Sequence, residues 1–153
     1  KFLVDEIMPY VWEQLPNVKL HIVGSLKSAF EELDNPRVVF HGRVENVDPF
    51  LLNTKMMVAP LRYGAGVKGK VGQALEYFLP VVTSTIGAEG MYLKDYENVL
   101  IADDPTEFAR KIIELHTDVS IWERLSSFSE KSLRPFSLNT LGQQIEKIES
   151  LIH

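Results

Sequence analysis

The chain has 153 residues, of which 45% are hydrophobic, 24% are charged and none is cysteine, and its formal net charge is −5 at pH 7. This composition is ordinary for one globular domain, so it excludes disorder, collagen-like repeats and coiled coil, and the absence of cysteine excludes disulfides, thiolate zinc sites and cysteine nucleophiles. The acidic balance argues against nucleic acid as a partner, and no apolar run approaches the roughly 20 residues that a membrane-spanning helix needs.

The chain opens with a predicted helix over residues 3–15. Apolar residues recur there at helical spacing along one face, and Pro9 predicts a kink. The residues of that face are Val4, Ile7, Met8, Val11, Trp12 and Leu15.

The next elements are two short strands, predicted over residues 18–23 and 37–40. A short helix through Ala29, Phe30 and Leu33 is expected between them.

Residues 48–53 follow as a brief helix, which Asp48 is expected to cap and Pro49 to begin. A buried strand is predicted over residues 56–59, ending at Pro60.

After a glycine-rich loop, Val71, Ala74, Leu75 and Phe78 recur at helical spacing. Pro80 ends that helix before a strand over residues 81–83, and a fifth strand is predicted over residues 98–101.

The C-terminal third reads as three helices. Asp104 is expected to cap the first, and Ser120 with Glu123 forms a predicted capping box for the second. A final helix from about Ser137 carries a narrow apolar stripe that must pack on something. The residues of that stripe are Leu138, Leu141, Ile145, Ile148 and Ile152.

Five strands that are apolar throughout, each followed by a helix or a turn, predict a parallel sheet covered on both faces. The fold class is therefore α/β, a doubly wound, Rossmann-like domain. In such sheets ligands bind at the carboxyl ends of the strands, where the loops after Val23, Phe40, Ala59, Thr83 and Ile101 would meet.

The loop after residue 59 is the strongest candidate site for an anion. Residues 49–75 contain no Asp or Glu, whereas four cations and four of the nine glycines fall there. Glycines let backbone N–H groups approach a ligand, and a helix N-terminus with Lys68 and Lys70 adds positive charge, which suits a diphosphate. The spacing fits no Walker A loop, and a tight turn with solvated lysines explains the same residues about equally well.

Several motifs occur in a fixed order along most of the chain. The segment PLRYGAGVKGK (residues 60–70) is followed by QAL (73–75) and LPVVTSTIGAEGM (79–91), and supporting segments are PNVKLHIVG (16–24), VVFHGRV (38–44) and NVLIADD (98–104). Together they resemble the C-terminal, donor-binding half of group 1 (family 4-like) retaining glycosyltransferases, which have the two-domain GT-B fold.

This resemblance implies particular ligand contacts. The loop at Gly42, Arg43 and Val44 would contact the nucleotide base, largely through its backbone. The glycine loop at Gly64, Ala65 and Gly66 would lie beside the donor sugar and diphosphate, with Lys70 and Lys68 as phosphate partners.

The chain departs from the family at the paired glutamates separated by seven residues, which fall on Ala65 and Gln73. The first carboxylate is absent. Gln73 can still donate to and accept from ribose hydroxyls, although without charge.

The catalytic residue remains unknown from the sequence. Glu89 is the nearest carboxylate in the matching strand-end loop, and a turn-capping role explains it equally well. His41 reads more readily as a packed histidine than as a site residue. Asp103 and Asp104 resemble a metal pair, but the N-cap explains Asp104 better, and no metal or other cofactor is expected.

The resemblance divides the chain into a nucleotide-sugar-binding domain over residues 1–136, expected to lack its first strand, and a C-terminal helix over 137–153 that would pack toward a missing N-terminal acceptor domain. The chain is therefore expected to be a fragment of a cytoplasmic retaining glycosyltransferase, inactive alone, with a nucleotide-diphosphate sugar as donor. Peripheral membrane association of the full-length enzyme is left open. The alternatives are a nucleotide-sugar epimerase of the same fold and a non-catalytic α/β binding module.

Overall fold

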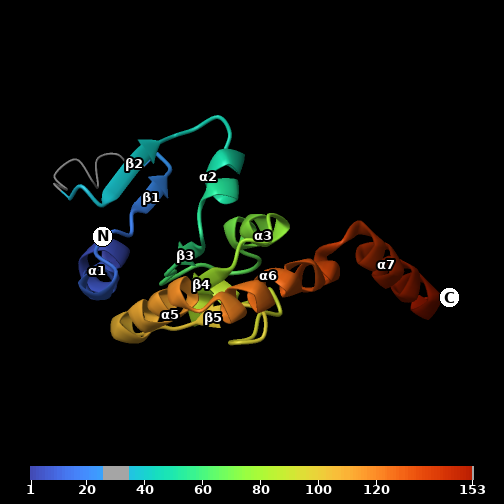
Figure 1. The fold of residues 1–153 in the computed structure, drawn as a ribbon. Helices are drawn as coiled ribbons and strands as arrows, with labels where there is room; N and C mark the ends of the chain where they lie inside the picture. The colour runs from blue at the N-terminus through green and yellow to red at the C-terminus, as the bar shows by residue number, and fades with distance from the viewer. Residues whose placement is uncertain (26–34, 153) are drawn as a thin grey trace.

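The computed structural model describes residues 1–25 and 35–152, and it is an α/β structure with an extended C-terminal helix (Figure 1). The five strands are β1 (Leu20–Val23), β2 (Val38–Gly42), β3 (Met57–Ala59), β4 (Val81–Thr83) and β5 (Leu100–Ile101). The α-helices are α1 (Met8–Gln14), α2 (Asp48–Asn53), α3 (Gly69–Glu76), α4 (Thr85–Ala88), α5 (Pro105–Thr117), α6 (Val119–Leu133) and α7 (Leu138–Ile152). The helix predicted through Ala29, Phe30 and Leu33 lies outside the described residues.

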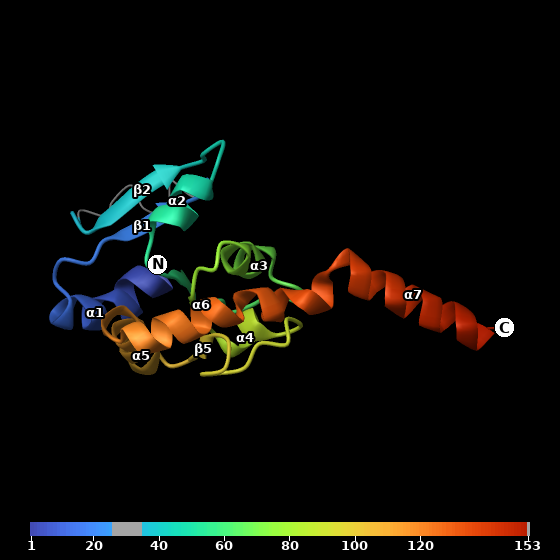
Figure 2. The ribbon, with the colours of Figure 1, turned by 45° about the vertical axis from the view of Figure 1, so that its right-hand side comes forward.

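All five strands pair in parallel, as predicted, but they form two sheets instead of one. One sheet has the order β1-β2 and the other β3-β4-β5. The predicted α/β class with parallel strands is confirmed, and only the pairing of the described strands into one continuous sheet was not met, because an apolar run predicts a buried strand without saying which strand lies beside it. In both views β1 lies on the side of its sheet that is nearer to the three-stranded sheet (Figures 1 and 2).

Burial on both faces holds for only part of the structure. β4 is buried at all three positions, whereas every residue of β2 is half-buried. Helices α1 and α5 pack on one core cluster around Phe108 and Leu115, while α3 covers a second cluster around Leu75 and Val81. The three-stranded sheet therefore holds the better-buried core.

The opening helix forms where apolar residues recur, and its irregular part lies before the proline. Residues Leu3–Ile7 form a π-helix, and Pro9 lies in the first turn of α1. Proline has no N–H to donate to the preceding turn, which accounts for a wider turn just before it. The predicted apolar face is buried, except that Leu15 is half-buried.

The helix caps were predicted with mixed success. Asp104 caps α5 as expected, because its carboxylate accepts hydrogen bonds from the N–H groups of Thr106 and Glu107. The expected caps at Asp48 and Ser120 were wrong. Asp48 is already helical and donates its N–H to Asn46, and Asp118 caps α6.

The final helix extends away from the rest of the structure in both views (Figures 1 and 2). Leu138, Leu141 and Ile145 of the predicted apolar stripe are exposed, and the side chains of Ile148 and Ile152 lie outside the described part. Among the described residues, no helix combines the length and the apolar character needed to span a membrane.

Candidate functional site

The carboxyl ends of β3, β4 and β5 are held together by side-chain hydrogen bonds. Thr83 donates its hydroxyl to the carbonyl of Ala59 over 2.9 Å, and Ser84 donates to the carbonyl of Leu61 over 2.5 Å. The carboxylate of Asp103 accepts hydrogen bonds from both the N–H and the hydroxyl of Thr85. These contacts fix the three strand ends relative to one another.

A cavity of about 440 Å³ lies at this edge of the three-stranded sheet. Most of its lining residues are apolar, and its polar side chains are Arg62, Ser84, Thr85 and Asp103. The guanidinium of Arg62 lies 5.1 Å from the ring centroid of Phe2. The remaining lining residues are Phe2, Pro60, Leu61, Ile86, Ala102 and Phe108.

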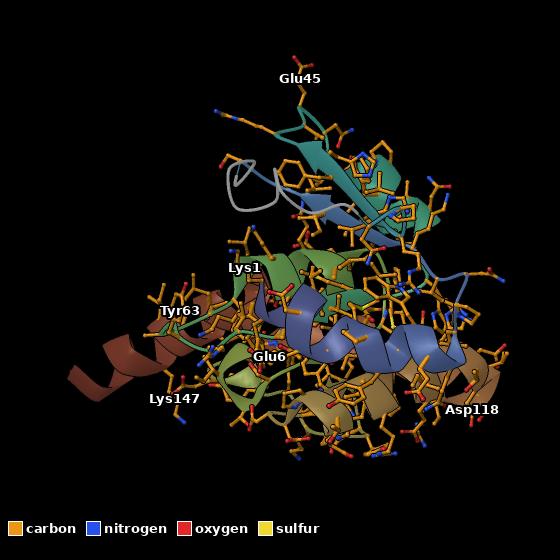
Figure 3. The ribbon with its side chains drawn as sticks, turned by 90° about the vertical axis from the view of Figure 1, so that its left-hand side faces the viewer. Lys1, Glu6, Glu45, Tyr63, Asp118 and Lys147 are labelled. Carbon is orange, nitrogen blue, oxygen red and sulfur yellow. The ribbon has the colours of Figure 1, made fainter. Side chains whose placement is uncertain are left out.

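The glycine-rich loop leaves β3 beside this cavity and ends at the N-terminus of α3. Gly64 has a φ of +130° and Gly66 a φ of +72°, and both values favour glycine. Tyr63 is 87% exposed, and Figure 3 shows it projecting outward. The loop therefore exposes its backbone at the edge where a ligand was expected.

The four cations of the acid-free segment do not share one location. The ammonium of Lys55 donates to the carbonyl of His116, which removes Lys55 from the site. The ammonium of Lys68 donates to the carbonyls of Gly66 and Gly64. Lys70 lies exposed in the first turn of α3, and no hydrogen bond or ion pair engages its side chain in the described part of the chain.

The structure brings Glu89 close to the glycine loop through its neighbour. A Cβ atom on Gly90 would lie 3.4 Å from the carbonyl carbon of Gly66, so the turn after α4 packs against the loop. Glu89 ends α4 and is exposed. Gln73 is half-buried on α3, and Ala65 is exposed within the loop.

The other predicted contact, the loop after β2, begins with a constrained glycine. Gly42 has a φ of +69° and accepts a hydrogen bond from the N–H of Gly24. Arg43 is exposed and Val44 is half-buried. No hydrogen bond, ion pair or ring contact joins Arg43 to the glycine loop within residues 1–25 and 35–152, so its role stays a prediction.

His41 packs against neighbouring rings, which agrees with the prediction that it is a packed histidine and not a site residue. Its Nε2 atom lies 2.9 Å from Nδ1 of His21, and its ring meets Phe50 edge-on with centroids 4.6 Å apart. Burial, together with the charges of His41 and Lys19, lowers the pKa of His21.

The aspartates after β5 serve structural roles. Hydrogen bonds from Thr106 and Glu107 lower the pKa of Asp104, while Asp103 bonds Thr85. Across the described residues, no group of three potential metal ligands lies close enough to hold an ion.

Sequence reasoning did not predict the hydrogen bonds that connect the strand ends. The side chains that make them are Thr83, Ser84 and Asp103. Ser84 carried a usable signal, because a serine between a strand and a helix is a typical N-cap, and its side chain accepts the N–H of Gly87. Thr83 carried none, since its hydroxyl contacts a residue 24 positions away.

Comparison with known proteins gives a family match and a set of similar folds. The model of "Glycosyl transferases group 1" matches residues 1–118. The chain is 28% identical over 127 residues to an uncharacterized 44.6 kDa protein in the cps region of Klebsiella pneumoniae, a match that covers 76% of this chain and 33% of that protein.

Two solved structures illustrate the fold. A TarM mutant of S. aureus, in complex with fondaparinux, alpha-GlcNAc-glycerol and UDP, has a TM-score of 0.77 at 19% identity, covering 95% of this chain and 31% of that one. Anabaena HepE in complex with UDP-glucose has a TM-score of 0.74 at 18% identity, covering 95% of this chain and 45% of that one. The chain thus spans less than half the length of each of these three proteins.

Proposed function

This chain belongs to the group 1 glycosyl transferases, and we propose that it forms the donor-binding part of a retaining glycosyltransferase that takes its sugar from a uridine diphosphate sugar. The reaction would move the sugar to an acceptor and leave the nucleoside diphosphate behind.

The observation that carries this proposal is the geometry of the glycine loop. Two glycines with positive φ lead from β3 into the N-terminus of α3, and Lys70 lies exposed in its first turn. A helix N-terminus carries partial positive charge and unpaired N–H groups, so this arrangement suits a diphosphate. The UDP in the similar TarM structure and the UDP-glucose in HepE favour uridine as the base.

Lys70 and the amide groups of this loop would act on the leaving group. Negative charge grows on the diphosphate as the bond to the sugar breaks, so a fixed positive charge there stabilises the transition state more than the ground state. This chain supplies no glutamate at position 65, and its contact with the sugar would be made by the loop backbone.

Two other contacts complete the proposed donor site. Gln73, half-buried on α3, would hydrogen-bond the ribose hydroxyls through its amide. The backbone of Gly42, Arg43 and Val44 would contact the base. Glu89 precedes Gly90, which packs against the loop at Gly66, and we keep Glu89 as the candidate for contact with the sugar.

We also propose that residues 1–136 form one nucleotide-sugar-binding domain whose sheet is completed by one more strand. The N–H of Leu20 donates to Arg37 and that of Met57 to Pro80. Because successive residues of a parallel strand bond to opposite sides, the backbone groups of His21 and Val58 point away from those partners, toward the free edges of β1 and β3. A parallel strand from polypeptide preceding Lys1 would satisfy both edges and join the two sheets.

The opposite edge of the three-stranded sheet is closed, which supports this placement. At β5, Asp95 accepts the N–H of Ile101 and Lys111 donates to its carbonyl. These side chains occupy the positions that a further strand would need. The β3 edge is therefore the one that can be extended.

The C-terminal helix over residues 137–153 would pack against another part of the longer protein. Its exposed residues Leu138, Leu141 and Ile145 form the apolar stripe that such a contact would bury.

The proposal is tested by titrating UDP, GDP and ADP into the protein in a calorimeter, followed by an assay for sugar transfer. Binding of UDP, with transfer only when the acceptor-binding part is present, supports it. Formation of an epimerised donor without acceptor would favour an epimerase, and binding of none of the three at millimolar concentration would favour a non-catalytic module.

A further inference from the structure

The ammonium group of Lys68 bonds to the glycine loop itself. Its Nζ atom lies 2.6 Å from the carbonyl oxygen of Gly66 and 3.3 Å from that of Gly64. Lys68 is also the residue that precedes the first turn of α3, where its own carbonyl accepts the N–H of Gly72. One residue therefore links the start of the helix to two points of the loop.

These bonds determine which way the loop amides face. In a planar trans peptide the C=O and N–H groups point in opposite directions. Turning the carbonyls of Gly64 and Gly66 toward Lys68 therefore turns the N–H groups of Ala65 and Val67 away from it. Neither amide has a hydrogen-bond acceptor in the described part of the chain.

The loop needs such a restraint because its glycines are permissive. Gly64 and Gly66 both adopt positive φ, and glycine populates many other conformations at little cost. The half-buried Lys68 already uses two of its three donors on carbonyl groups, whereas the exposed Lys70 has all three available.

We propose that Lys68 is a positioning residue, whose ammonium holds the glycine loop so that the amides of Ala65 and Val67 face the diphosphate, while Lys70 alone supplies the side-chain charge to the phosphates. The assignment rests on the proposed function for its ligand, and it replaces the expectation that Lys68 contacts phosphate. The restraint itself exists without any ligand.

The test compares Lys68→Met, Lys68→Arg and Lys70→Met with the unmodified protein, first without ligand. Backbone amide order parameters from NMR relaxation should be about 0.85 for Gly64–Val67 in the unmodified protein and below about 0.6 in Lys68→Met. Lys68→Arg, which keeps a cationic donor, should restore rigid values, and Lys70→Met should leave them unchanged. Equal order parameters in Lys68→Met and the unmodified protein would overturn the proposal.

The second readout is the dissociation constant of UDP at several salt concentrations. Both Lys68→Met and Lys70→Met should weaken binding and flatten the salt dependence, because each removes a positive charge within a Debye length of the phosphates. The flattening should be clearly smaller in Lys68→Met, whose lost group is bonded to the loop carbonyls and not to the phosphates. Equal flattening in the two variants would indicate direct phosphate contact by Lys68 and overturn the proposal. Failure of the unmodified protein to bind UDP would refute the proposed function, and the order parameters would still decide the role of Lys68.

Discussion

The backbone of Gly87 lies directly against the hydroxyl group of Thr83. A Cβ atom added to Gly87 would lie 2.0 Å from Thr83 Oγ1, and this hydroxyl is already fixed by its hydrogen bond to the carbonyl of Ala59. Only a residue without a side chain allows α4 to pack this closely on β4. The contact places the turn that carries Glu89 and Gly90 beside the glycine loop.

Replacing Gly87 by alanine should therefore destabilise the protein. Thr83 is fully buried, so the added methyl group must displace either the threonine or the helix, at a cost of about 1–3 kcal/mol in the free energy of unfolding. Urea denaturation measures the change.

Gly72→Ala is the matched control, because its Cβ would lie 3.6 Å from Met91 Cε, an ordinary contact. Alanine is favoured over glycine inside a helix, so this variant should gain roughly 0.5–1 kcal/mol. Equal effects of the two substitutions would contradict the packing argument.

A buried lysine closes the outer edge of the three-stranded sheet. Lys111 has 4% of its side chain exposed, pairs with Asp95 over 2.5 Å and donates to the carbonyl of Ile101. Lys111→Met keeps the length of the side chain but removes the ion pair with Asp95 and leaves the carbonyl of Ile101 without its charged donor, so unfolding should become easier by about 1.5–3 kcal/mol.

The control for this change is Lys94→Met. Lys94 pairs with Glu97 at the surface, where 71% of its side chain is exposed. Such substitutions usually change stability by less than about 0.5 kcal/mol. If the two substitutions lower the free energy of unfolding equally, Lys111 does not stabilise the β5 edge of the sheet.

The stability of the protein should depend on pH through His21. Burial and its neighbours lower the pKa of His21 from 6.5, and Nδ1 of His21 faces Nε2 of His41 over 2.9 Å, so one of the two rings must stay neutral to accept. Below pH 6.5 the unfolded chain binds protons that the folded chain excludes. The contribution of neutral His21 to the free energy of unfolding is therefore complete above pH 6.5. It is lost as the pH falls toward the lowered pKa of the folded protein.

Melting temperatures between pH 7.5 and 5 check this dependence. The unmodified protein should lose more stability over that range than His21→Gln, which cannot be protonated. His116 also has a lowered pKa and is present in both proteins, so its effect cancels. Parallel curves for the two proteins would refute the role of His21.

The sequence was sufficient to predict most of the described elements, with α4 as an exception, but not their assembly. β4 was predicted to its exact bounds, because Pro80 cannot continue the preceding helix and a short apolar run follows it. The division into two sheets was not predicted from the apolar runs, since strand pairing depends on contacts between distant residues, and we propose that the strand expected to be missing accounts for it. The cap of α6 was misplaced by two residues, because Asp118 and Ser120 are both good cap residues and only the backbone geometry selects between them.

The sequence predicted an exposed glycine-rich loop between a strand and a helix, and the structure places residues 60–68 as such a loop at the sheet edge. Ligand binding by this loop stays a prediction. The hydrogen-bond partner of each lysine was not predictable from the sequence. Lys55, Lys68 and Lys70 have the same side chain and differ only in the groups that the fold places near them.

The central claim, that the glycine loop binds the diphosphate of a nucleotide through Lys70, is tested most directly by calorimetric affinities for UDP and uridine. We expect Lys70→Ala to weaken UDP binding about tenfold or more, as the loss of a charged hydrogen bond implies, and to leave uridine binding unchanged. The control is Lys55→Ala, because the ammonium of Lys55 bonds to the carbonyl of His116 away from the loop. This variant should change neither the affinity for UDP nor that for uridine. Equal losses for UDP and uridine in Lys70→Ala, or no binding of UDP by the unmodified protein at millimolar concentration, would contradict the claim.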